Sequence, residues 1–173
     1  IADHIRAVAL CIADGQLPSS SGAGYVIRRI LRRAIRYGYS FLHFRHSFIH
    51  QVFHVLEHQM GSAFPELTKN KNLITQVIKE EEESFLRTLE KGIELLDQVI
   101  QKTPGKEING AIAFELYDTF GFPIDLTQLI AGENSKEINI AEFESHLQAQ
   151  KERSRAATKL ETDDWVVLHD GDT

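Results

Sequence analysis

The sequence predicts an all-α fold of about seven helices, one of them long, followed by a short strand-like tail. Apolar side chains recur at steps of three and four residues along most of the chain, which is the spacing of a helix with one buried face. Clusters of Gly, Pro and Ser separate these periodic segments and fit loops of ordinary length. The chain has 173 residues, 42% hydrophobic and 25% charged, so it can bury a sizeable core and does not have a disordered composition.

We expect residues 1–159 to form one helical domain, with a basic subregion at 1–60 and an acidic subregion at 65–159. Residues 160–173 are expected to begin a linker or strand that leads to a further domain. Residues 1–56 hold seven of the 19 basic residues and only two of the 25 acidic ones, so the net charge of −6 hides two parts of opposite sign. A basic part joined to an acidic one indicates a polyanion as the partner of the basic part.

The first predicted helix covers residues 1–13, whose apolar side chains are spaced for one face. A loop at 14–22 follows, and one of its serines can cap the next helix. That helix begins near residue 22 and is expected to end at Gly38.

Five arginines fall within nine residues of this second helix: Arg28, Arg29, Arg32, Arg33 and Arg36. At about 100° per residue they occupy an arc of roughly 140°, and apolar side chains take the opposite side. No acid lies between Gly15 and His54, so nothing on the helix itself neutralises this arginine ridge. The ridge is solvated, paired with acids from elsewhere in the fold, or directed at phosphates, whose oxygens guanidinium forks bind in pairs.

A third helix is predicted over residues 46–60. Its apolar side chains form one broad face: Phe48, Val52, Val55, Leu56 and Met60. Four histidines follow one another at four-residue steps on the other side: His46, His50, His54 and His58. Imidazoles four residues apart can bind Zn²⁺ or Ni²⁺, so this histidine ladder is a candidate metal site. We favour the alternative, a water-exposed face that holds no functional metal.

After Pro65, apolar residues continue at helical spacing to about Lys102, which predicts a single long helix. Four consecutive glutamates at 80–83 interrupt the pattern, and one of them must point toward the apolar stripe. The segment is a solvated helix, or supplies these acids to the arginine ridge, or pairs with a second copy as a coiled coil.

The rest of the chain alternates short helices with breaks. In order, the predicted segments are a turn at 103–106, a helix from Asn109 or Gly110 to Tyr117, a break at Gly121 and Pro123, a helix at 125–131, a loop with a short extended piece at 132–138, a helix at 140–159 and a strand-like run at 165–168. The break is placed there because glycine suits a left-handed helix cap and proline cannot continue a helix.

Several classes of protein are excluded by what the sequence lacks. It has no apolar run long enough to span a bilayer and no signal peptide, and its single cysteine, Cys11, fits a reducing compartment. We therefore expect a cytoplasmic protein without a membrane partner. No Walker loop, dinucleotide fingerprint, serine elbow or paired-cysteine metal site is present. Asp118 and Asp125 could be taken for a catalytic carboxylate pair, but their places at helix ends explain both.

What remains is an arginine ridge with tyrosines and phenylalanines beside it, a combination that indicates nucleic-acid binding. Five blocks of sequence are more specific: IADHIRA at 1–7, DGQLPS at 14–19, GYVIRRILRRAIR at 24–36, EEESFLRTLE at 81–90 and LYDTFGFPIDLT at 116–127. In their order and spacing these blocks closely resemble the alanyl-tRNA synthetases, particularly bacterial ones. The resemblance covers nearly the whole chain.

The resemblance implies the helical middle domain that these enzymes place between the class II aminoacylation core and the editing domain. Such a domain recognises the acceptor stem of tRNA(Ala) by a G·U wobble pair. The aspartate that the family uses for this contact corresponds to Asp118. The family's asparagine corresponds to a position where this chain has Ser20, which is shorter and lacks the amide.

We expect the arginine ridge to bind tRNA phosphates: Arg28, Arg29, Arg32, Arg33 and Arg36. ATP and zinc are expected only in other domains of the parent enzyme. This chain alone should therefore bind tRNA(Ala) and should not activate alanine.

Two other classes of function stay open. The chain could be a structural helical connector, in which case intramolecular acids would take up the arginine ridge. It could also be a hydrolytic or metal enzyme built on the histidine ladder. Because the chain starts at Ile1 rather than at a methionine and stops in a polar stretch, we expect it to be a piece of a longer protein.

Overall fold

The computed structural model describes the backbone of residues 1–161 and the side chains of residues 1–156, and it confirms the all-α prediction. The described part has eight helices and two short strands: α1 (Ala2–Ala13), α2 (Gly22–Phe41), α3 (Ile49–Met60), α4 (Pro65–Lys69), α5 (Lys71–Lys102), β1 (Glu107–Ile108), α6 (Gly110–Asp118), α7 (Ile124–Glu133), β2 (Glu137–Ile138) and α8 (Ile140–Glu161). The predicted strand-like run at 165–168 lies outside the described residues.

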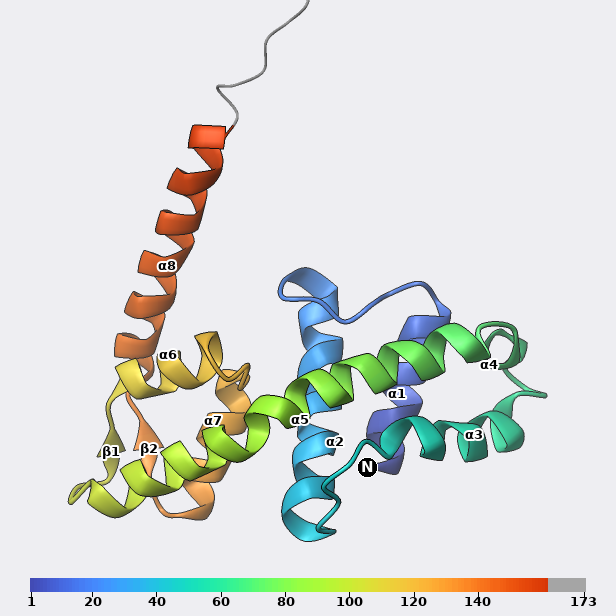
Figure 1. The fold of residues 1–173 in the computed structure, drawn as a ribbon, viewed down its shortest axis with the longest axis horizontal. Coiled ribbons are helices and arrows are strands. Elements are labelled where there is room, and N and C mark those ends of the chain that lie inside the picture. Colours follow the sequence, from blue (N-terminus) through green and yellow to red (C-terminus); the bar gives the residue numbers. More distant parts are fainter. Residues whose placement is uncertain (162–173) are drawn as a thin grey trace, which may run out of the picture.

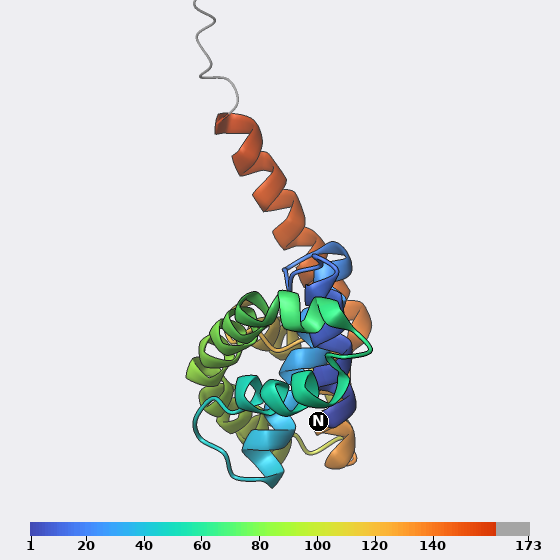
Figure 2. The same cartoon turned by 90° about the vertical axis from the view of Figure 1, so that its right-hand side faces the viewer.

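The long helix α5 is the spine of the molecule. It runs the length of the body, with α1, α3 and α4 packed near its beginning and α6, α7 and the two strands near its end (Figure 1). Helix α2 crosses α5 near its middle and also packs on α1, so the arginine ridge lies where the two groups of helices meet. Helix α8 packs on α6 and then projects away from the body (Figure 2).

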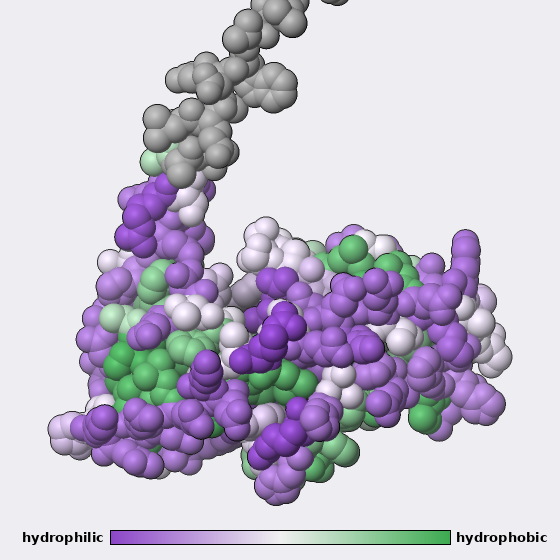
Figure 3. Space-filling view, viewed as in Figure 1, coloured by the Kyte–Doolittle hydropathy of each residue, from purple (hydrophilic) through white to green (hydrophobic). Residues whose placement is uncertain are grey.

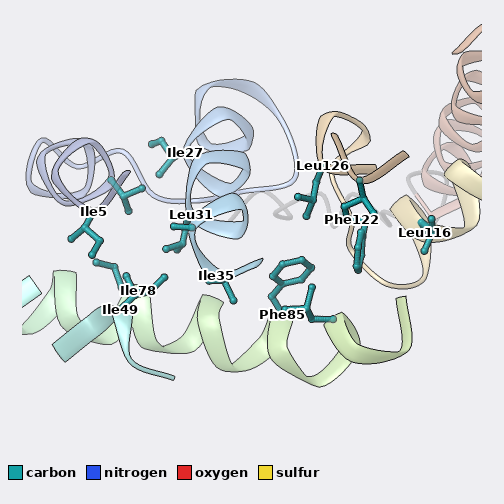
Figure 4. Close-up of a cluster of buried hydrophobic side chains, with 14 of the residues drawn as sticks. Ile5, Ile27, Leu31, Ile35, Ile49, Ile78, Phe85, Leu116, Phe122 and Leu126 are labelled. Carbon is teal, nitrogen blue, oxygen red and sulfur yellow. The ribbon is translucent and has the colours of Figure 1, made fainter. Parts of the chain in front are cut away.

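One apolar core runs along α5 on both sides of the α2 crossing. Figure 4 shows Ile5, Leu31 and Ile78 gathered on the α1 side, and Phe85 and Phe122 on the α7 side. The rings of Phe85 and Phe122 meet edge to face, with centroids 5.5 Å apart. Gly92 of α5 permits this approach, because a Cβ there would overlap the Phe122 ring.

Helix α2 does not end at Gly38 as predicted but continues to Phe41. Gly38 is buried inside the helix, and the ring of Phe48 occupies the place that a Cβ would take. The glycine therefore serves a close side-chain approach from the following loop and not a left-handed cap.

The third helix begins at Ile49, not at residue 46, and the predicted apolar face is correct only in part: Phe48, Leu56 and Met60 pack against the core, whereas Val52 and Val55 are exposed. Its buried side chains are Ile49 and Phe53, whereas Val55 is 56% exposed. Because residues 52, 53 and 55 are all apolar, periodicity alone allowed two different faces, and the packing on α5 selected the one that contains Phe53.

The predicted single helix from Pro65 to Lys102 is two helices, because the chain breaks at Asn70. The backbone of Asn70 leaves the helical conformation, and its side-chain amide donates to the carbonyl of Ala13 at the end of α1 (3.1 Å). A tertiary contact therefore sets the break, and it explains why the described part has eight helices where seven were expected.

Residues 103–139 fold much as predicted, apart from a pair of strands. Asn109 caps α6 by accepting from the N–H of Ala111 at 2.7 Å. The two-residue strands β1 and β2 pair in parallel, which ties the end of α5 to the start of α8. The sequence indicated an extended piece only for the second strand.

Candidate nucleic-acid interface

A cleft of about 570 Å³ opens between the beginning of α2, the end of α6 and one face of α8. Thirteen residues line it: Ser20, Tyr25, Arg28, Arg32, Tyr117, Asp118, Gly121, Pro123, Leu147, Gln150, Lys151, Ser154 and Arg155. Figure 3 shows the column of α8 standing apart from the body, and both carry hydrophilic surface. Four of the lining side chains are cationic and one is a carboxylate, so the cleft suits an anionic ligand.

Asp118 is the last residue of α6 and is exposed at the cleft. The turn that follows is held firmly: Gly121 has a left-handed backbone (φ 71°), and the N–H of Phe122 donates to the carbonyl of Leu116 at 2.9 Å. Arg32 also donates to the carbonyl of Gly121, which joins the turn to α2. The predicted break is therefore confirmed, and it places Asp118 on a rigid support.

The Asp118 carboxylate is oriented by α8 and not by its own turn. Its Oδ1 accepts a hydrogen bond from the side-chain amide of Gln150. Within the described part of the chain no backbone N–H donates to Asp118, so the structural role considered for it, capping the turn, is not observed. Asp118 nevertheless remains exposed and lines the cleft.

Ser20 lies on the opposite side of the cleft, in the loop before α2. The loop is fixed against the first turn of the helix, because Gly24 leaves room for the carbonyl of Leu17 and for Ser19. Ser19 Oγ donates to the carbonyl of Ser21 at 2.6 Å, while Ser21 occupies the N-cap without a side-chain capping bond. The fold thus brings together the two residues that the family resemblance singled out.

All five members of the arginine ridge form ion pairs within the chain. The pairs are Arg28 Nη2 with Glu81 Oε1 (2.7 Å), Arg32 Nη2 with Glu81 Oε2 (3.3 Å), Arg29 Nε with Asp125 Oδ1 (2.9 Å), Arg33 with Asp125, and Arg36 Nη1 with Glu133 Oε1 (3.0 Å). The interpretation that the glutamate run supplies an internal partner for the ridge is confirmed through Glu81. Contact between the ridge and RNA phosphates stays a prediction.

Members of the ridge differ in how far they can reach a ligand. Arg28 and Arg32 line the cleft, whereas Arg29, Arg33 and Arg36 face α7. Arg32 is only 12% exposed and lies over the Phe85 ring, 4.8 Å from its centroid. Burial lowers the pKa of Arg32 from its ordinary value, and the carboxylate of Glu81 opposes that shift. The guanidinium is thus held in place as much by packing as by charge.

The second wall of the cleft was missed from the sequence. Five residues of α8 share the face toward the cleft: Leu147, Gln150, Lys151, Ser154 and Arg155. Their spacing alternates steps of three and one, which is a helical stripe. The sequence predicted only that this helix is charged and polar, because its acids and bases alternate and mask the stripe.

The histidine ladder does not become one continuous surface. His46 precedes α3, and His50 is half-buried with its Nδ1 3.6 Å from Glu82 Oε2, while His54 and His58 are exposed. Among the described residues, no three His, Cys, Asp or Glu side chains are grouped so as to hold a metal ion. Asp118 and Asp125 are held by different partners, so they do not form a pair.

Comparison with known proteins gives the family. The family described as "tRNA synthetases class II (A)" matches residues 1–171, and the chain belongs to it. Curated relatives named alanine--tRNA ligase are 61% identical in Flavobacterium psychrophilum (99% of this chain, 19% of the relative), 58% in Bacteroides fragilis (100% and 20%) and 50% in Cytophaga hutchinsonii (99% and 20%). The chain spans about a fifth of the length of these relatives.

None of the helices in the described part of the chain combines the length and the apolar character needed to cross a membrane.

Proposed function

We propose that this chain is the tRNA-recognition domain of an alanyl-tRNA synthetase, and that it reads the acceptor stem in the cleft between α2, α6 and α8. The observation that carries the proposal is the meeting of Ser20 and Asp118 across a cationic cleft, although they are far apart in sequence. The relatives' name, alanine--tRNA ligase, supports a tRNA ligand of this kind.

The chemistry of the cleft suits a G·U wobble pair. In A-form RNA the minor groove is wide and shallow, and a wobble pair leaves the guanine 2-amino group free there. A carboxylate is an acceptor without a donor, so Asp118 Oδ2 can accept from that amino group. Ser20 both donates and accepts through one hydroxyl, which gives a shorter and less directional contact than an amide would give.

The proposal extends to the whole protein. We place the chain between an aminoacylation core and an editing domain, with residues 1–159 as the recognition domain and residues 160–173 leading onward. The parent would join alanine to tRNA(Ala) at the expense of ATP in the cytoplasm, with ATP and zinc bound by other domains. The 173-residue chain alone is expected to show no alanine-dependent pyrophosphate exchange.

The test is a competition between two acceptor-stem hairpins that differ only in G·U against G·C. Wild type should prefer the G·U stem, and Asp118→Asn should lose about 1–3 kcal/mol of that preference, by analogy with other single base-edge contacts. Asp118 is exposed, so the melting temperature should stay unchanged. Equal binding of both stems by the wild type would contradict the proposal.

A second candidate function, a structural connector between catalytic and editing parts, is favoured by the ion pairs. Glu81, Asp125 and Glu133 join the arginine ridge to α5 and α7, which makes the two groups of helices one rigid unit. A connector of this kind would bind neither hairpin at low salt. Saturable binding of a hairpin would exclude it as the sole function.

A further inference from the structure

Two cations of helix α8 form no ion pair with any residue that the structure describes. Lys151 and Arg155 line the cleft one helical turn apart, and both side chains are exposed. No side-chain hydrogen bond joins either of them to another described residue. On a helix, residues four apart are neighbours on the same face, so the two charges act on the same part of the cleft.

The cations on the α2 side of the cleft, Arg28 and Arg32, already have a carboxylate partner. Arg28 and Arg32 share the carboxylate of Glu81, and Arg32 also donates to the carbonyl of Gly121. A phosphate that approached them would compete with a carboxylate already bound. Exposed cations without a partner lose less on binding a phosphate, because no existing ion pair has to break.

We propose that Lys151 and Arg155 form the main phosphate-binding site of the cleft. They bind the RNA backbone from α8 while Asp118, oriented by the neighbouring Gln150, faces the base pair. This inference rests on the proposed function, since it assumes that an RNA stem occupies the cleft. It assigns the two tasks to different residues: the cations of α8 supply affinity, and Asp118 supplies selectivity.

The experiment compares two double variants of the 173-residue chain. Lys151→Ala with Arg155→Ala removes the proposed site. Lys91→Ala with Arg153→Ala removes the same charge from exposed positions that do not line the cleft. Arg153 is the closer control, because it lies on the same helix, about 200° around the axis from Lys151.

Hairpin affinity is measured at several salt concentrations for each variant. The cleft variant should flatten the plot of log affinity against log salt by about one unit for each phosphate that is no longer bound, and should weaken the G·U and G·C stems equally. The control variant should change the slope much less. Lys151→Gln with Arg155→Gln removes the two charges but keeps a polar side chain at each position, and it should repeat the result.

The outcomes separate this inference from the proposed function. If the wild type binds the hairpin and both double variants bind with the same slope as the wild type, the phosphate site is wrong and the proposed function survives. If the cleft variant loses G·U preference but keeps its salt slope, α8 acts on the base pair and the inference is also wrong. If the wild type binds neither hairpin, both proposals fall.

Discussion

Gln150 is a single side chain that determines how Asp118 is presented. Its amide donates to Oδ1 of Asp118, which lines the cleft, so the carboxylate is held before any ligand arrives. A group that is already ordered loses less conformational entropy on binding. No local pattern in the sequence connects these two residues, because 150 lies on a different helix from 118 and only the α6–α8 packing brings them together.

Gln150→Ala is expected to reduce the preference for a G·U stem by about 1 kcal/mol, less than Asp118→Asn, because the carboxylate remains but must be ordered on binding. The measurement is the same hairpin competition. Gln148→Ala is the matched control, since Gln148 bonds Glu152 on the same helix and does not line the cleft. A variant as selective as the wild type would show that Gln150 does not position Asp118.

Glu82 is the member of the glutamate run that points into the core, as the helical pattern required. Its side chain is fully buried and accepts from the N–H groups of Phe48 (2.9 Å) and Ile49 (3.0 Å) at the start of α3. The carboxylate of one helix therefore caps another. Burial raises the pKa of Glu82 above its ordinary value of 4.5, and the two N–H groups and His50 oppose that shift.

Replacing Glu82 should reveal both roles. Glu82→Ala leaves buried N–H groups without an acceptor and is expected to cost about 1–3 kcal/mol of unfolding free energy. In the wild type the folded chain raises the pKa of Glu82, so protonation of this carboxyl stabilises the folded state relative to the unfolded one. The stabilisation from protonation is present below pH 4.5 and is lost as the pH rises through the pKa of the folded state.

Glu82→Gln cannot titrate, so the stability difference between the two proteins should shift in favour of the glutamine variant as the pH rises from about 4 to about 7. Denaturant unfolding at several pH values measures this. A difference that does not change with pH would mean that the pKa of Glu82 is the same in the folded and unfolded chains.

At the scale of elements, α2 is attached to its neighbours by shared carboxylates. Glu81 of α5 takes two arginines, and so does Asp125 of α7. Each cluster joins one carboxylate to two arginines, but the two clusters differ in burial. Arg32 of the Glu81 cluster is 12% exposed, whereas both arginines of the Asp125 cluster are more than a third exposed.

Removing either carboxylate should therefore have unequal effects. Asp125→Ala is expected to cost about 1 kcal/mol, since water can solvate the arginines that it frees. Glu81→Ala is expected to cost roughly 2–4 kcal/mol, because it leaves the guanidinium of Arg32 charged and largely buried. Thermal or denaturant unfolding of both variants at one pH makes the comparison, and equal costs would show that burial of Arg32 is unimportant.

The elements that the sequence predicted well are those whose signals are local. Periodicity located the helices, and the glycine and proline after α6 located the break there. Two of the errors share a cause: the break at Asn70 and the start of α3 at Ile49 each coincide with a hydrogen bond to a residue far away in sequence, Ala13 and Glu82 respectively. At Gly38 the glycine accommodates the ring of Phe48 from the loop after α2. Such contacts cannot be read from the local pattern.

The candidate site also contains residues that the sequence identified and residues that it did not. Asp118 and Ser20 were named from a family resemblance, and the fold places both at one cleft. The arginine ridge was found from its acid-free sequence, but its pairing with Asp125 and Glu133 could not be, because those acids come from a helix far along the chain. The α8 wall was hidden by alternating charges.

For the whole molecule, folding brings acidic residues from the second part of the sequence against basic residues from the first part. The basic part and the acidic part are not separate surfaces, because three carboxylates from residues 81, 125 and 133 lie against five arginines of α2. Four cations line the cleft: Arg28 and Arg32, which pair with Glu81, and Lys151 and Arg155 of α8. The linear sequence thus shows the arginines of α2 without the carboxylates that pair with them in the fold.

We therefore expect that replacing paired arginines of α2 lowers mainly the stability, and that replacing the cations of α8 lowers mainly the affinity for RNA. Arg32→Ala with Arg36→Ala removes the two least exposed members of the ridge, 12% and 7% exposed, together with their packing on Phe85 and Phe41. The pair should lower the unfolding free energy by roughly 2–4 kcal/mol, since ion pairs and the packing of buried aliphatic stems are removed together.

The same variant should flatten the salt dependence of hairpin binding by at most about one unit, through Arg32 at the cleft. Lys151→Ala with Arg155→Ala should do the reverse, with a near-normal melting temperature and a strongly reduced slope. Measuring unfolding and binding on both variants in the same buffer sets the two readouts side by side. If the Arg32 and Arg36 variant kept its stability and lost most of its hairpin affinity, the ridge would serve RNA directly and its ion pairs would be dispensable to the fold.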